Sequence, residues 1–193
     1  MAARVDGRDA HNCLYRMSVI ATSLRTARLV LEPIGVARAA RLLSGDLSEL
    51  QCGPGWPHDD TFAALGMAAL ASADVNAGWF ILRDAEVIGE IGPKCDLRNI
   101  DDEAAKIDVE IGYGLGEGAR GHGYGSEAAR AVVDWLLGWP AVLAVTADVE
   151  VGNKASANLL ALIGFVLDSP VSPDPASSLG SVWQHWRLPV AKS

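Results

Sequence analysis

Residues 109–125 read V-E-I-G-Y-G-L-G-E-G-A-R-G-H-G-Y-G, and they lead into an apolar helical pattern at 126–138. The stretch begins as a strand and becomes a loop, with six glycines from Gly112 to Gly123. Glycine lets a ligand approach the main chain closely, and amides that converge at a helix N-terminus bind anions. Arg120 adds a formal positive charge at this turn. The stretch therefore predicts a cradle for phosphate.

The spacing of the loop residues narrows the kind of phosphate ligand. The sixth place of Gly112-x-Gly114-x-x-Glu117 is Glu, which argues against a dinucleotide loop, and no Gly-Lys-Ser/Thr follows, which argues against a nucleoside-triphosphate loop. Arg120-x-x-Gly123-x-Gly125, after a strand and before a helix, instead resembles the acyl-CoA loop of the GCN5-related N-acetyltransferases (GNAT family). In that family the loop amides hold the CoA pyrophosphate.

A second motif lies at Asn153-x-x-Ser156, followed by a helical pattern and by Gly164-Phe165. It resembles a GNAT signature in which the Asn contacts the pantetheine arm. The Ser hydroxyl lies near the CoA sulfur and can protonate the leaving thiolate. Two simpler roles stay open, because Asn153 can cap the helix and a helix serine can bond its own main chain.

The resemblance covers Thr26 to Leu188, and Thr26-x-Arg28-Leu-x-Leu resembles the opening strand of the ribosomal-protein N-terminal acetylating branch. It implies an α/β fold of the GNAT type. We expect a mixed, twisted sheet of about seven strands, splayed at a central bulge, with helices on both faces. We expect one domain over 24–190 and a flexible arm over 1–23.

Hydrophobic periodicity and turn residues place the expected elements along the chain. Strands are expected at 26–34, 78–83, 86–91, 106–115, 141–150, 165–167 and 181–188, and helices at 36–43, 61–72, 126–138 and 153–163. Residues 169–180, with three prolines and four serines, are expected to form a loop.

The resemblance also implies which residues hold the donor. On the strand, a splayed main-chain N–H near Tyr113, Gly114 and Leu115 would face the thioester oxygen, and glycines inside a strand fit such a bulge. The expected loop contacts to CoA are Arg120, Gly121, His122, Gly123, Tyr124, Gly125 and Ser126, with Asn153 and Ser156 on the pantetheine and the sulfur.

Glu110 is the leading candidate for the general base. It lies on the strand that leads into the loop, and in related enzymes the corresponding Glu points to the acceptor cleft. Asp108 shares its face by two-residue alternation and is the second candidate. A simple ion pair is an equally open interpretation of Glu110. His122 occupies a variable place in the motif, so a solvent-facing imidazole is expected there.

Composition limits the class of partner. The chain has 193 residues, 50% hydrophobic and 21% charged, with a formal net charge of −8 and a pI near 4.9. An acidic chain disfavours nucleic acid and mildly favours cationic substrates. No apolar run reaches membrane-helix length and no secretory signal is visible, so we expect a cytoplasmic protein without membrane contact. The four histidines and three cysteines lack metal-ligand spacing, so no metal is expected.

Together these features predict an acetyl-CoA-dependent N-acetyltransferase in which a primary amine attacks the thioester directly. The amine would belong to a protein or peptide N-terminus or to a small molecule, and a homodimer stays open. Two alternatives remain. One is a noncatalytic CoA-binding module. The other is an acyltransferase using a larger donor such as succinyl-CoA, which a basic side chain near the acyl pocket would favour.

Overall fold

The computed structural model describes residues 22–62, 78–95, 97, 100–173 and 182–190. For residues 169–173 it describes the backbone only. The predicted helix at 61–72 and the predicted arm at 1–23 therefore lie largely outside the described residues. In chain order the elements are β1 (Leu24–Arg25), β2 (Val30–Pro33), α2 (Val36–Leu43), β3 (Gln51–Cys52), β4 (Trp79–Arg83), β5 (Glu86–Pro93), β6 (Ile107–Leu115), the 3-10 turn η1 (Glu117–Ala119), α4 (Tyr124–Leu137), β7 (Val142–Glu150), α5 (Lys154–Leu162), β8 (Val166–Pro173) and β9 (Val182–Pro189).

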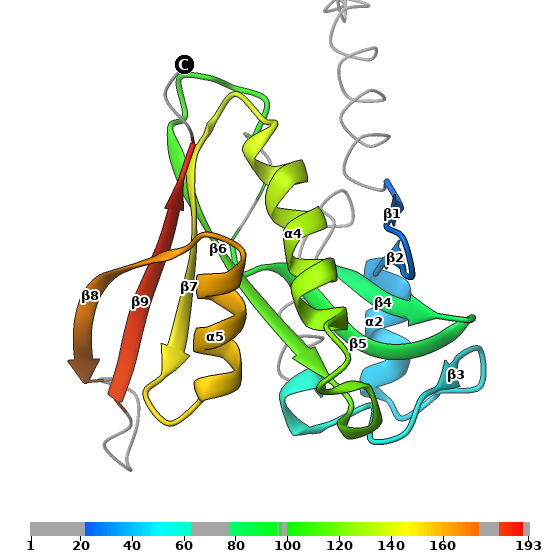
Figure 1. The fold of residues 1–193 in the computed structure, drawn as a ribbon. Coiled ribbons are helices and arrows are strands. Elements are labelled where there is room, and N and C mark those ends of the chain that lie inside the picture. The colour runs from blue at the N-terminus through cyan, green and yellow to red at the C-terminus, as the bar shows by residue number, and fades with distance from the viewer. Residues whose placement is uncertain (1–21, 63–77, 96, 98–99, 174–181, 191–193) are drawn as a thin grey trace, which may run out of the picture.

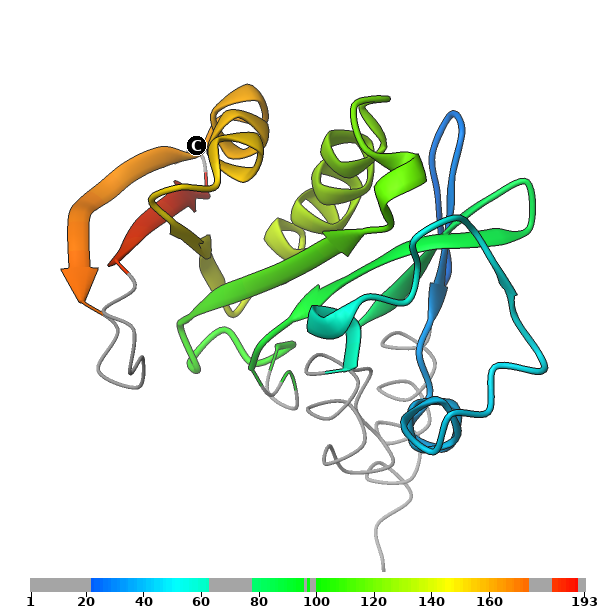
Figure 2. The same ribbon diagram turned by 90° about the horizontal axis from the view of Figure 1, so that it is seen from below.

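The described strands form one mixed sheet in the order β1-β2-β4-β5-β6-β7-β9-β8, with β3 beside β5. The β6–β7 and β3–β5 pairs are parallel and the others are antiparallel. Helices α4 and α5 cover one face and α2 lies on the other (Figures 1 and 2). The predicted mixed sheet with helices on both faces is confirmed. It has nine strands instead of about seven, and two of these, β1 and β3, are only two residues long.

Element boundaries differ from expectation at two places. The first part of the strand expected over 26–34 is instead a turn, in which Thr26 N donates to Leu29 O (3.0 Å) and Leu29 N donates to Thr26 Oγ1 (3.0 Å), and β2 begins only at Val30. The hydroxyl thus stabilises a turn inside an alternating pattern. The strand expected to end at 167 continues as β8 to Pro173, because its backbone pairs with β9 as far as Pro173↔Val182.

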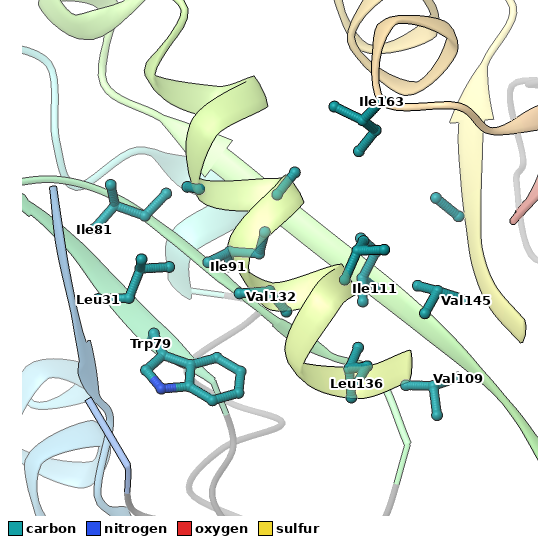
Figure 3. Close-up of a cluster of buried hydrophobic side chains, with 14 of the residues drawn as sticks. Leu31, Trp79, Ile81, Ile91, Val109, Ile111, Val132, Leu136, Val145 and Ile163 are labelled. Atoms are coloured by element: carbon teal, nitrogen blue, oxygen red, sulfur yellow. The ribbon is translucent and has the colours of Figure 1, made fainter. Parts of the chain in front are cut away.

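The main core lies between α4 and the sheet. Val132 and Leu136 of α4 are buried against Val109 and Ile111, which are alternate residues of β6 (Figure 3). The helix places its apolar residues on one side, and the strand places every second residue on the same side. The residues between them, including Glu110, consequently face the side of the sheet that carries α2.

The sheet opens between β6 and β7. Their parallel pairing runs from Ile107↔Val142 to Glu110↔Thr146, with an irregularity at Ile107–Asp108. Beyond Glu110, β6 stays paired with β5 up to Gly89↔Leu115, while β7 stays paired with β9. The two strands diverge toward their C-terminal ends (Figure 1). The predicted splay therefore begins directly after Glu110.

Candidate active site

Main-chain amides of β6 point into this opening. Gly116 N donates to Ile88 O (2.9 Å) and Lys94 N donates to Glu110 O (2.8 Å), so the even-numbered residues of this stretch bond toward β5. Because antiparallel ladders alternate, the amides of Tyr113 and Leu115 point the other way, beyond the last β6–β7 pair. The strand thus offers donors where the sequence predicts a thioester oxygen.

The glycine loop follows immediately. Gly121 and Gly123 both have φ of 78°, a left-handed conformation that glycine adopts without strain, and Gly123 is the N-cap of α4. No side chain caps this helix, so the first N–H groups of α4 stay available to a ligand. Arg120 is exposed, and its Nε donates to Leu115 O (3.0 Å). Ser126, half-buried in the first turn, completes the expected phosphate cradle.

An acidic residue of α4 ties this loop to the β1–β2 turn. Glu127 accepts hydrogen bonds from Thr26 Oγ1 (2.6 Å), Arg28 N (2.9 Å) and Arg28 Nε (2.7 Å). Burial opposes ionisation of Glu127, but these bonds and the Arg28 charge outweigh burial and lower its pKa. Arg28 Nη1 also donates to His122 O (3.0 Å). Arg28 therefore holds the loop as well as the helix.

The sequence interpretation missed two guanidinium groups that lie beside the glycine loop. Arg28 and Arg83 lie over the ring of Tyr124, at 4.6 and 5.1 Å from its centroid. His122 is exposed and stacks on the same ring at 5.6 Å, so its expected solvent-facing position is found. Tyr124 itself is buried. A bound acyl-CoA would therefore contact the main-chain amide of Tyr124 and not its phenol.

Ser156 lies next to Tyr113 on the α5 side of the opening. Asn153 Oδ1 accepts from Ser156 N (3.0 Å), so the capping role expected for Asn153 is present. Burial raises the pKa of the Tyr113 phenol. The phenol oxygen makes no hydrogen bond of full geometry with a described residue, yet the neighbouring Ser156 hydroxyl opposes part of the rise. Two neutral O–H groups thus lie together where a thiolate would need a proton.

The two candidate bases lie on the opposite face of β6 and both form ion pairs. Glu110 Oε1 accepts from Lys94 Nζ at 2.7 Å, and both side chains are partly exposed. Asp108 accepts from the Arg187 guanidinium through both oxygens, at 3.0 to 3.3 Å. Since Glu110 uses one oxygen and Asp108 uses two, Glu110 is the freer carboxylate of the pair.

A third carboxylate on this face was missed by the sequence interpretation. Glu90 of β5 is buried, and its Oε2 accepts from Trp56 Nε1 (2.5 Å) and Thr61 Oγ1 (3.0 Å). Its Oε1 lies 3.3 Å from His58 Nε2. The sequence places these residues about thirty positions apart, in a strand and in a Gly/Pro-rich loop. Alternation along β5 could not have suggested an inward carboxylate, because a register irregularity opposite Ile81 and Leu82 interrupts it.

Within the described residues, no group of three or more His, Cys, Asp or Glu side chains could hold a metal ion. The described helices also include none that is long and apolar enough to span a bilayer. The described site therefore consists of main-chain amides, hydroxyls, carboxylates and cationic side chains.

Comparisons with known proteins agree with this architecture. The family model described as acetyltransferase (GNAT) domain matches residues 28–166. The uncharacterized N-acetyltransferase YjdG of Bacillus subtilis (strain 168) is 30% identical over 120 residues, which is 58% of this chain and 68% of that protein.

Two solved structures share the fold at low sequence identity. A RimL ribosomal L7/L12 α-N-protein acetyltransferase in complex with coenzyme A aligns with a TM-score of 0.60 at 13% identity, over 88% of this chain and 98% of that one. The microcin C7 self-immunity acetyltransferase MccE, in complex with acetyl-CoA and AMP, aligns with a TM-score of 0.58 at 17% identity, over 86% and 94%. With the family model matching most of the chain, we conclude that this protein belongs to the GNAT acetyltransferase family.

Proposed function

We propose that the protein transfers an acetyl group from acetyl-CoA to a primary amine, which attacks the thioester directly. The observation that carries the proposal is the course of β6. This strand leaves β7 after Glu110, presents outward amides at Tyr113 and Leu115, and then enters the uncapped N-terminus of α4. A thioester oxygen and a pyrophosphate need donors in this order along one extended ligand. Complexes of RimL with CoA and of MccE with acetyl-CoA support the same donor.

The donor is held by residues of the loop and of α5. The amides from Gly121 to Ser126 would bind the pyrophosphate, with the Arg120 guanidinium as a charged partner. Asn153 would contact the pantetheine arm. The Tyr113 amide would polarise the thioester carbonyl, because it points into the opening beyond the last β6–β7 pair.

One residue on each face of β6 would transfer a proton: Glu110 would accept one, and Ser156 would donate one. Glu110 takes a proton from the attacking amine, directly or through a water, while the C–N bond forms. The C–S bond then breaks, and Ser156 supplies a proton to the CoA thiolate and takes one back from solvent, with the buried phenol of Tyr113 beside it. For Glu110 to act, the acceptor must approach the oxygen that Lys94 does not occupy.

A protein or peptide N-terminus is the acceptor we favour, with a small amine as the other candidate. The opening strand resembles the ribosomal-protein branch, and RimL shares the fold. The exposed side chains of Asp59 and Asp60, on the α2 side of the sheet with Glu90, favour a cationic ligand.

The test is an assay of free CoA thiol released from acetyl-CoA with a panel of acceptors. The panel contains an alanine-initiated peptide, its N-acetylated form, putrescine and an alcohol of matched size. We expect turnover with free amines and none with the blocked peptide or the alcohol. Faster turnover with the alcohol than with every amine would overturn the proposal. CoA binding without any thiol release would instead support a noncatalytic CoA-binding module.

One observation favours a larger acyl donor as a second candidate. The side chain of Lys94 lies across Gly112, with its Cε 2.9 Å from where a Cβ at Gly112 would be. A cation at this place suits a donor whose acyl chain ends in a carboxylate, such as succinyl-CoA. Glu110 neutralises Lys94, which favours acetyl-CoA. Comparing kcat/KM for the two donors, in wild type and in Lys94→Met, decides between them.

A further inference from the structure

The Glu90 cluster lies directly on the strand that would carry the thioester. Glu90 pairs with Gly114 across β5 and β6. A Cβ built on Gly114 would come within 2.5 Å of His58 Nε2 and 2.6 Å of Glu90 Oε1. The glycine therefore lets an imidazole and a carboxylate reach the main chain of β6, next to the Tyr113 amide.

One polar atom in this cluster lacks a well-formed partner among the described residues. Glu90 Oε2 accepts from Trp56 and Thr61, and Oε1 is the oxygen that lies near His58. His58 Nε2 is buried and has no hydrogen bond of full geometry with any described residue. Although the two atoms lie 3.3 Å apart, they do not satisfy each other. A donor with several N–H groups could bond both at once.

Glu90 and Glu110 mark the two ends of one strip on the acceptor face. Gly114, opposite Glu90, lies four residues beyond Glu110 on the same face of β6, about 13 Å along an extended strand. Between them Gly112 and Gly114 carry no side chain of their own, and the side chains of Lys94, His58 and Glu90 lie against them. A ligand over this strip would displace the Lys94 side chain and would lie with Glu110 at one end and Glu90 and His58 at the other.

We propose that Glu90 and His58 form the ammonium-binding subsite of the acceptor, which holds the reacting amine over Gly114 while Glu110 removes its proton through intervening water. The inference rests on the proposed amine acetylation and deepens it. An ammonium has three N–H donors, one each for Glu90 Oε1 and His58 Nε2 and one for the water that leads toward Glu110. The subsite selects ammonium acceptors over hydroxyl acceptors, because an alcohol leaves the buried carboxylate without its charge partner.

The same cluster could instead be only a structural strut, since Trp56 and Thr61 fasten the 53–62 loop to β5 through Glu90. The protonation of Glu90 distinguishes the two roles. Burial raises the pKa of Glu90 and nearby Asp60 adds to the rise, while Trp56, His58 and Thr61 oppose it. A bound ammonium favours the ionised form and lowers the pKa of Glu90, so binding releases protons at pH values between the pKa of the free carboxyl and that of the bound one. A strut releases none.

The first measurement is calorimetric binding of the alanine-initiated peptide to the protein saturated with CoA. It is repeated between pH 5 and 7 in two buffers of different ionisation enthalpy. We expect proton release in wild type and its loss in Glu90→Gln. The matched control is Glu86→Gln, the same change at the exposed start of β5. No proton release in wild type, or equal release in Glu90→Gln, overturns the proposal even if the variant folds poorly.

The second measurement is steady-state kinetics with the peptide and with putrescine. Glu90→Gln should raise KM for both amines by about tenfold or more. Its Kd for CoA should stay near that of wild type, as in Glu86→Gln. Unchanged KM, or loss of affinity for both CoA and the amine, would mean that the cluster has only a structural role. If wild type acetylates no amine at all, the proposed function fails first, so the two failures are distinguishable.

Discussion

Gly123 combines a left-handed backbone conformation with a predicted contact to the CoA phosphates. Its φ of 78° starts α4, and a Cβ there would lie 3.5 Å from Arg28 Nη2, beside the proposed phosphate cradle. We expect Gly123→Glu to abolish CoA binding, because it adds a like charge. Gly123→Asn is the matched control, since Asn tolerates the left-handed region and adds no charge. Calorimetric titration with CoA checks both.

Arg120 belongs to the same test. Its guanidinium is held beside the strand end by one bond to Leu115 O. Arg120→Ala should weaken CoA binding by about 1–3 kcal/mol, the range of a charge-assisted hydrogen bond. Arg41→Ala, in the exposed ion pairs at the end of α2, should leave it unchanged. Equal affinities in the Gly123→Glu, Arg120→Ala and wild-type proteins would mean that the phosphates bind elsewhere.

Glu110 is predicted to set the acidic limb of the pH profile. A general base must be ionised to accept a proton, so kcat/KM falls as the carboxylate becomes protonated. Glu110→Gln should therefore flatten this limb and lower kcat, whereas Asp108→Asn should not, because Arg187 occupies both of its oxygens. A limb that persists at the same pH in Glu110→Gln would place the base elsewhere.

Ser156 is predicted to act on the leaving group and not on donor affinity. Ser156→Ala should lower kcat while the Kd for CoA stays nearly constant, because Asn153 bonds the Ser156 amide and not its hydroxyl. Tyr113→Phe is the companion variant, since its phenol shares this site. If Ser156→Ala weakens CoA binding and turns over normally at saturation, the hydroxyl only positions the donor.

At the scale of elements, the β1–β2 turn supports the N-terminus of α4 through Glu127. Loss of its three hydrogen bonds in Glu127→Ala should lower the free energy of unfolding by about 1–3 kcal/mol. The pKa of Glu127 is lowered in the folded protein. Its stabilisation is therefore fully present above the unfolded pKa near 4.5 and is lost as pH falls through the lower folded pKa. Thermal unfolding of wild type and variant should accordingly converge in strong acid. Glu117→Ala, exposed in η1, is the control and should show no such gap at neutral pH.

The elements that the sequence predicted well are those specified by neighbouring residues. The strand, glycine loop and helix of 107–137 follow from alternation, glycine spacing and a 3.6-residue period, and the Asp84-Ala85 turn has the two positive φ values that a two-residue hairpin requires. The Thr26–Leu29 turn was missed because one hydroxyl interrupts an otherwise regular strand pattern.

Contacts between distant residues could not be predicted in the same way. Arg28 and Glu127 are 99 positions apart, and Trp56 and Glu90 are 34 apart. Nothing local to either partner specifies the other, because the pairing depends on how the sheet is ordered. The ion pair of Glu110 was only an open interpretation for the same reason, since Lys94 reaches it from the end of β5. The donor half was therefore visible in motifs, whereas the acceptor half required the fold.

At the scale of the whole molecule, the sheet separates these two halves. Helices α4 and α5 lie on one face of the sheet and α2 lies on the other (Figure 2). Ser156 belongs to α5, whereas Glu110 alternates with the buried Val109 and Ile111, and Glu90 bonds Trp56 on the α2 side. The two halves meet only where β6 leaves β7. If the proposed sites are right, the donor and the acceptor would reach the reacting carbon from opposite sides, which suits direct transfer without a covalent acyl-enzyme.

The net charge of −8 gives the last prediction, because it should act on the acceptor over a longer range than any contact. Asp59 and Asp60 are exposed carboxylates in the helical turn that directly follows His58. A cationic acceptor should be attracted to this face, and salt should screen the attraction, since the Debye length is about 10 Å at 0.1 M. We expect kcat/KM for putrescine to fall as NaCl rises from about 0.02 to 0.5 M, through KM and not kcat. The double variant Asp59→Asn/Asp60→Asn should reduce this slope, whereas Asp134→Asn on α4, on the donor face, should not. A salt slope that is the same in all three proteins would mean that the acceptor does not approach along the 58–60 loop.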